Sequence, residues 1–180
     1  MKKILISVIS FVMLFISVNA LTIDEIGENL KKLEIVNGYE DGDLRFNNYI
    51  TRAEIAAIVV RIMESKGINE SASELKFDDL KPEFWGNKYI YIVNNSHIMT
   101  GFPDNTFKPG KNITYGEVLT ILVRLVGKDN NLSEETWPYN YFDKSLEIGI
   151  INEELIKNMN DNITRGEVFK LIWNTIKIEL

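Results

Sequence analysis

The chain has 180 residues, with 20 Lys and Arg against 26 Asp and Glu, one histidine and no cysteine. The net charge of −6 argues against a basic nucleic-acid-binding surface, and the lack of cysteine excludes disulfides and thiolate metal sites. A single histidine cannot build a Cys-His pair or a His-rich zinc site, so we expect no enzyme, no metal and no cofactor.

The first twenty residues have the pattern of a secretory signal peptide. Two lysines are followed by an uncharged apolar run over residues 4–18, and Val18 and Ala20 are small residues placed as at a cleavage site. The apolar run is shorter than the roughly 20 residues needed to span a bilayer. We therefore expect residues 1–20 to be removed, leaving an exported chain without a membrane anchor.

A repeated Ile-Thr-x-x-Glu motif organises the rest of the chain. It occurs at residues 50–54, 113–117 and 163–167. The sequences around the motif also align, which predicts three repeat units over residues 21–67, 74–127 and 133–180. Because a unit of this length has too little apolar surface for a core of its own, we expect one cooperative domain over residues 21–180.

Each unit is predicted to be helix, loop, helix, which makes the fold all-α. In the first unit, a short helix begins close to residue 21, and apolar residues at helical spacing after Thr51 predict a longer one. A polar linker over residues 64–76 leads to the second unit, and another over residues 128–135 leads to the third. Short helices are expected at Trp85–Val93 and Trp137–Leu146, and longer ones after Thr114 and Thr164. The loops between them carry Gly, Asp, Asn and Pro.

The repeated motif has the form of a capping box. A threonine at the N-cap and a glutamate three residues later can each satisfy a backbone N–H of the first turn. The predicted pairs are Thr51 with Glu54, Thr114 with Glu117, and Thr164 with Glu167. Arg52 and Arg165 follow the cap directly, where the helix dipole disfavours a cation. Beside free N–H groups such an arginine makes an anion site, although it can also simply reach into solvent.

The motifs, taken in series, resemble the S-layer homology domain family. The second unit carries Phe77, Asp79 and Trp85, then the Gly101–Asp104 loop, and then Ile113, Thr114 and Glu117. The resemblance implies a pseudo-threefold helical bundle that binds pyruvylated secondary cell-wall polysaccharide in grooves between repeats, on a Gram-positive-type cell surface. It implies that two arginines contact the anion, that two tryptophans stack on the sugar, and that four loop residues lie near the ligand. These residues are Arg52, Arg165, Trp85, Trp137, Gly38, Asp41, Gly101 and Asp104.

Each unit departs from the family pattern in some respect. Thr22 aligns with Trp85, Tyr115 stands in place of the arginine of the second unit, and Asn152 replaces the loop glycine of the third. At most two of three sites therefore keep their arginine.

Other functions receive less support from the sequence. His97 falls at a helix end, where we expect a solvent-exposed or capping role, and residues 40–43 do not have the spacing of an EF-hand. A second hypothesis is that the grooves or apolar faces bind another exported or S-layer protein.

Overall fold

The computed structural model describes residues 21–71 and 77–178, so the predicted signal peptide lies outside the described residues. The described residues form helices and no β-strand, which confirms the all-α prediction. The α-helices are α1 (Ile23–Lys32), α2 (Arg52–Ser65), α3 (Asn87–Asn95), α4 (Tyr115–Leu125), α5 (Tyr139–Glu147) and α6 (Arg165–Thr175). Two short 3₁₀ helices, η1 (Glu134–Thr136) and η2 (Glu153–Leu155), lie on either side of α5. In the described ranges no helix is long and apolar enough to cross a membrane.

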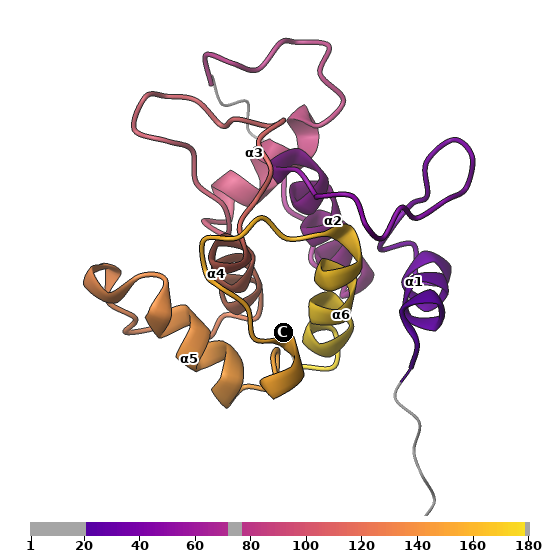
Figure 1. Ribbon diagram of the computed structural model, residues 1–180. Coiled ribbons are helices and arrows are strands. Elements are labelled where there is room, and N and C mark those ends of the chain that lie inside the picture. Colours follow the sequence, from indigo (N-terminus) through magenta and orange to yellow (C-terminus); the bar gives the residue numbers. More distant parts are fainter. Residues whose placement is uncertain (1–20, 72–76, 179–180) are drawn as a thin grey trace, which may run out of the picture.

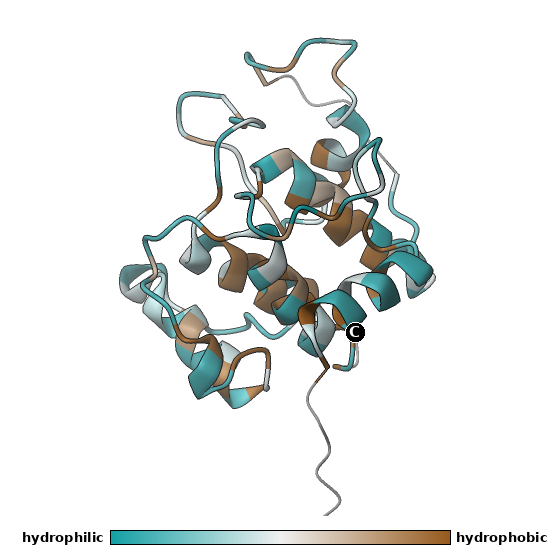
Figure 2. Ribbon diagram, turned by 45° about the vertical axis from the view of Figure 1, so that its right-hand side comes forward, coloured by the Kyte–Doolittle hydropathy of each residue, from teal (hydrophilic) through white to brown (hydrophobic). Residues whose placement is uncertain are grey.

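The short helix of each unit packs against the long helix of another unit. Helix α3 lies on α2, α5 lies on α4, and α1 lies on α6, so the first unit closes onto the last. In Figure 1 the long helices α2, α4 and α6 form the middle of the molecule, with α1 and α5 on opposite sides. Figure 2 shows many apolar residues along the long helices, and most of these belong to the buried core.

The three Ile-Thr segments meet in a closed cycle of backbone hydrogen bonds. The N–H of Ile50 donates to the carbonyl of Ile163 (3.2 Å), that of Ile163 to Ile113 (3.2 Å), and that of Ile113 to Ile50 (3.1 Å). All three side chains are fully buried. The starts of the three long helices are therefore fixed relative to one another.

The capping boxes are present at the start of all three long helices. In α2 the Thr51 hydroxyl accepts from the backbone N–H of Glu54, and the Glu54 carboxylate accepts from that of Thr51. The same exchange occurs between Thr114 and Glu117 in α4, and between Thr164 and Glu167 in α6. One further pair, Thr22 with Glu25, caps α1.

The next two N–H groups of each long helix bind a loop of another unit. The N–H of Arg52 donates to the carbonyl of Lys111 (3.0 Å), and that of Ala53 donates to Pro109 (3.0 Å). Helices α4 and α6 repeat this pattern with loops of the third and first units. The N–H groups that the sequence analysis expected to be free for an anion thus already have partners, because the cyclic packing brings loop carbonyls against them.

The helices α3 and α5 begin later than predicted. Trp85 and Trp137 precede the first helical turns, which start at Asn87 and Tyr139. Gly86 and Pro138 occupy the N-cap positions, and neither supplies a side-chain cap. Both indoles therefore lie on the connecting segments rather than on a helix face.

Candidate ligand-binding grooves

Two hollows of similar size lie between the units. The first groove, of about 200 Å³, brings together Arg52, Gly101 and Trp137. The second groove, of about 220 Å³, brings together Arg165, Gly38 and Trp85. Each groove thus combines an arginine from one unit, the loop and long helix of the next unit, and a tryptophan from the unit after that. Six of the eight residues expected at a ligand site line one groove or the other.

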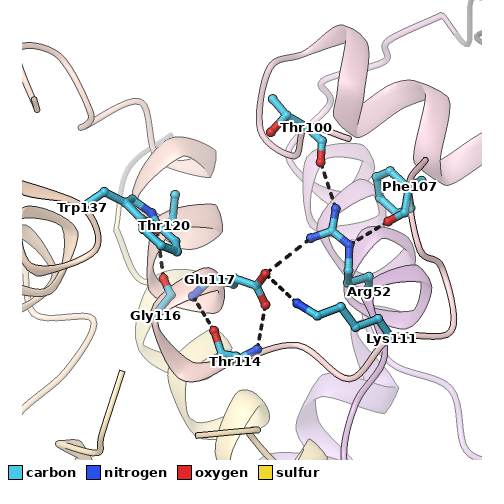
Figure 3. Close-up of polar contacts among 9 residues, drawn as sticks. All are labelled: Arg52, Thr100, Phe107, Lys111, Thr114, Gly116, Glu117, Thr120 and Trp137. Atoms are coloured by element: carbon cyan, nitrogen blue, oxygen red, sulfur yellow. Dashed lines mark hydrogen bonds and ion pairs between the residues drawn. The ribbon is translucent and has the colours of Figure 1, made fainter. Parts of the chain in front are cut away.

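Arg52 is buried in the wall of the first groove. The residue is 5% exposed, and its guanidinium donates from Nε to the carbonyl of Phe107 and from Nη2 to that of Thr100, both at 2.8 Å (Figure 3). Nη1 lies 4.0 Å from Oε1 of Glu117. Burial lowers the pKa of Arg52, and the nearby carboxylate of Glu117 opposes that change.

Arg165 has the equivalent position in the second groove. It is 4% exposed, and its Nε donates to the carbonyl of Leu44 at 2.9 Å. Its Nη1 lies 3.0 Å from Oε1 of Glu54, and its Nη2 donates to the carbonyl of Asn37 at 3.4 Å. Both arginines therefore hold the loop of the following unit, Arg52 through two hydrogen bonds to carbonyls and Arg165 through two hydrogen bonds to carbonyls and an ion pair.

The two tryptophans present their indoles to solvent. Trp137 is 44% exposed, and its Nε1 donates to the hydroxyl of Thr120 at 3.0 Å, which fixes the ring beside α4 (Figure 3). Trp85 is 57% exposed, and its ring packs against those of Phe84 and Tyr89 at centroid distances of 5.5 and 6.1 Å. Exposed indoles held in place suit stacking on the apolar face of a sugar.

The two loop glycines are needed for close packing. A Cβ at Gly101 would lie 2.3 Å from Cε1 of Phe77, and one at Gly38 would lie 2.6 Å from the carbonyl oxygen of Gly42. A larger residue would therefore force Phe77 to move at Gly101, and the backbone of the loop to move at Gly38.

Asp41 and Asp104 shape the loops without lining the grooves. Asp41 pairs with Arg45 and Asp104 pairs with Lys108, both at 3.0 Å. Hydrogen bonds from Arg45 lower the pKa of Asp41, and those from Thr106 and Lys108 lower the pKa of Asp104.

These aspartates place a loop cation over an aromatic ring. Arg45 lies 3.8 Å from the ring centroid of Tyr39, and Lys108 lies 4.2 Å from that of Phe102. Tyr39 lines the second groove and Phe102 lines the first, so the carboxylates act on the grooves through these aromatic residues.

The grooves also contain two arginines that the sequence analysis did not single out as site residues. Arg61 of α2 lines the second groove and Arg124 of α4 lines the first. Each lies seven residues after the capping glutamate, and therefore on the same helix face as that glutamate. This spacing, and the alignment of Arg61 with Arg124 between the first two units, was the signal that could have identified them.

The two groove arginines differ in their partners. Nη2 of Arg124 lies 3.5 Å from Oε1 of Glu134, and Nε of Arg124 donates to the hydroxyl of Tyr141 at 3.3 Å. Arg61 packs over the ring of Tyr89, and none of the ion pairs found among the described residues includes it. Its charge is therefore less neutralised than that of Arg124.

A third hollow, of about 180 Å³, lies where the third site of the cycle would be. Tyr115 occupies the place of the buried arginine, and its hydroxyl donates to the carbonyl of Leu155 at 2.8 Å. Desolvation by burial raises the pKa of Tyr115 to about 12. Lys157 pairs with Glu167, and no tryptophan lines this hollow. Two of the features shared by the first two grooves are thus missing from it.

Within the described residues, no group of three or more Asp, Glu or His residues is arranged to hold a metal ion. The grooves instead combine arginines, exposed indoles and tightly packed loops, in a cyclic helical arrangement.

Comparison with known proteins identifies the family. The model of the S-layer homology domain matches residues 28–56 and 76–119. The chain belongs to the S-layer homology domain family. The matched segments include Arg52, Trp85 and both loop glycines.

Two relatives match most of this S-layer homology chain. The middle cell wall protein of Brevibacillus brevis is 32% identical and the surface layer protein of Brevibacillus choshinensis is 30% identical, each over 157 residues and 85% of this chain. A cellulosome-anchoring protein of Acetivibrio thermocellus is 32% identical over 105 residues, or 56% of this chain and 23% of its own length. The chain spans only 14% of the length of the two Brevibacillus proteins.

Proposed function

We propose that this chain is a non-catalytic module that attaches, without a covalent bond, to an acidic secondary cell-wall polysaccharide. The S-layer homology family and the cell-wall, surface-layer and anchoring names of its relatives support anchoring at a cell surface. The observation that carries the proposal is the pairing of an arginine with an exposed indole in each of two grooves. In the second groove these residues are Arg61 and Trp85.

This combination suits a sugar that bears a carboxylate, such as a pyruvyl ketal. A guanidinium can bind a carboxylate through two parallel hydrogen bonds, while an indole covers the apolar face of the sugar ring. The grooves, at about 200 and 220 Å³, are smaller than the roughly 300–1,000 Å³ of pockets for drug-sized ligands. They therefore favour one substituted sugar at a time.

The buried arginines support this role through their charge. Arg52 and Arg165 are buried and bonded to the protein, but each places a positive charge at one wall of a groove. The net charge of −6 repels an acidic polymer at long range, so binding depends on these local charges. Direct contact with the substituent falls mainly to Arg61 and Arg124, which lie on the groove face of their helices.

The second groove should bind the acidic sugar more strongly than the first. In the first groove, Glu134 competes with the ligand for Arg124. In the second, none of the ion pairs found among the described residues includes Arg61, which packs over the ring of Tyr89. The third hollow lacks both the buried arginine and the tryptophan, and we propose that it contributes to packing and not to binding.

Sedimentation with purified cell-wall sacculi tests the proposal. The chain without its predicted signal peptide should sediment with sacculi, and should stop doing so after acid has removed the secondary polymer. Replacing Arg61 and Arg124 together by Gln should abolish sedimentation, while Lys170→Gln in the third hollow is the matched control and should not. Sedimentation that survives removal of the polymer would contradict the proposal and favour a protein partner on the wall.

A further inference from the structure

A fourth hollow shares Trp85 with the second groove. This Phe84 pocket, of about 420 Å³, is lined by Asp79, Lys81, Glu83, Phe84 and Trp85. Trp85 lines both the second groove and the Phe84 pocket, so the two hollows share this residue. If one sugar of a polymer binds in the groove, the neighbouring sugars lie outside it. The Phe84 pocket, which shares Trp85 with the groove, is one place where a neighbouring sugar could bind.

The segment that carries Phe84 and Trp85 is held in place before any ligand binds. Nδ2 of Asn87 donates to the carbonyls of Lys81 and Pro82, at 2.8 and 3.1 Å, and closes the loop. The ring of Phe84 folds over Gly86, where a Cβ would lie only 2.6 Å from it. A rigid aromatic platform loses little conformational entropy on binding.

The walls of the Phe84 pocket suit an uncharged sugar. Two aromatic rings supply an apolar surface, while the exposed side chains of Lys81 and Glu83 can hydrogen-bond to hydroxyl groups. The carboxylate of Asp79 already accepts from the backbone N–H groups of Phe107 and Lys108. Because the pocket has two acids and one lysine, a second acidic sugar would be repelled.

We propose that the Phe84 pocket is a second subsite, which binds an uncharged sugar of the same polymer whose acidic sugar occupies the second groove. This inference rests on the proposed function. The second groove then recognises a longer stretch of polymer than the first. Trp137 is preceded by Thr136 at the position of Phe84, so the first groove lacks the equivalent of Phe84.

Binding of polymer fragments of different lengths tests the second subsite. The starting protein is the chain in which Trp137→Ala and Arg124→Gln disable the first groove, and calorimetry measures its affinity for fragments of one and of several repeating units. Longer fragments should bind about tenfold more tightly than one unit. Phe84→Thr, which copies the third unit, should remove this advantage and weaken the binding of one unit far less, because Trp85 keeps its contact with Tyr89.

Two further variants distinguish a loss of stacking between Phe84 and the sugar from a disturbance of the segment that carries Phe84 and Trp85. Phe84→Tyr keeps an aromatic face and should keep the advantage of longer fragments, and Glu83→Ala should reduce it without disturbing the platform. If longer fragments bind no better than one unit, or if Phe84→Thr weakens both equally, the second subsite is wrong. If no fragment of any length binds, the groove proposal itself fails.

Discussion

Nη1 of Arg165 lies 3.0 Å from Oε1 of Glu54, although the two residues are 111 positions apart in the sequence. Arg165 is the first residue of α6, and Glu54 belongs to the capping box of α2. The same carboxylate accepts from the hydroxyl of Tyr39 at 3.1 Å. This partly buried contact therefore joins the last unit, the cap of α2 and the loop that lines the second groove.

Arg165→Ala should strongly destabilise the protein. It leaves Glu54 without its partner and removes hydrogen bonds to the carbonyls of Leu44 and Asn37. Breaking a buried ion pair costs about 3–5 kcal/mol, a large part of the stability of a small domain. Urea denaturation followed by circular dichroism measures the change. Arg61→Ala is the control and should cost less than about 1 kcal/mol, because Arg61 is in none of the ion pairs found in the described part of the chain.

A large loss of stability would mean that the motif arginine first holds the repeats together, and only then acts on a ligand. An Arg165→Ala protein as stable as the Arg61→Ala control would contradict this view.

Tyr115→Phe should destabilise the protein by about 1–3 kcal/mol near neutral pH, because the carbonyl of Leu155 loses its donor. The effect should shrink at alkaline pH. The pKa of Tyr115 is about 12 in the folded protein and 10.0 in its ordinary state, so between these values the unfolded chain loses a proton that the folded chain keeps. The contribution of Tyr115 is thus complete below pH 10 and is lost as the pH rises toward 12.

The difference in unfolding free energy between the wild type and Tyr115→Phe, measured from pH 8 to 12, checks this expectation. Taking a difference removes the titration of the other tyrosines and the lysines. A difference that stays constant up to pH 12 would show that burial does not raise the pKa of Tyr115 in the folded protein.

The sequence predicted the features that are local to one repeat. The three capping boxes follow from the spacing of Thr51 and Glu54 and its copies, and the long helices follow from apolar periodicity. The predicted starts of the two short helices, Trp85 and Trp137, lie two residues before the observed starts. An aromatic residue is compatible both with a helix and with the loop that precedes one, so the sequence did not define the boundary.

The partners of the motif arginines could not be deduced from the sequence in the same way. Arg52 binds carbonyls of the following unit, and a sequence read one unit at a time cannot show which loop the cyclic packing brings against the helix start. For the same reason the expected free N–H groups already have partners. Arg61 and Arg124 were visible as an aligned pair, but only the fold shows that their helix face lines a groove.

His97→Gly should stabilise the protein by about 0.5–1 kcal/mol. His97 has a φ of 57° in the turn after α3, a left-handed conformation that costs a residue with a Cβ roughly 1–2 kcal/mol, part of which glycine's larger loss of entropy offsets. The aligned residues Glu34 and Gly149 have φ values of 59° and 80°, so the fold requires this conformation in every unit. Thermal unfolding measures the gain, and Gly149→Ala should show the opposite change.

Glu134→Ala should strengthen binding in the first groove. Glu134 is exposed and pairs with Arg124 at 3.5 Å, an interaction worth about 0.2–1 kcal/mol that an acidic sugar must displace. Freeing Arg124 should therefore raise the affinity for a single acidic unit by up to about fivefold, measured in a protein whose second groove is disabled by Arg61→Gln. Glu135→Ala, one residue along in η1, removes the same charge at a position that does not line the groove and is the matched control. Equal gains from both variants would show that the net charge, and not the partner of Arg124, limits binding.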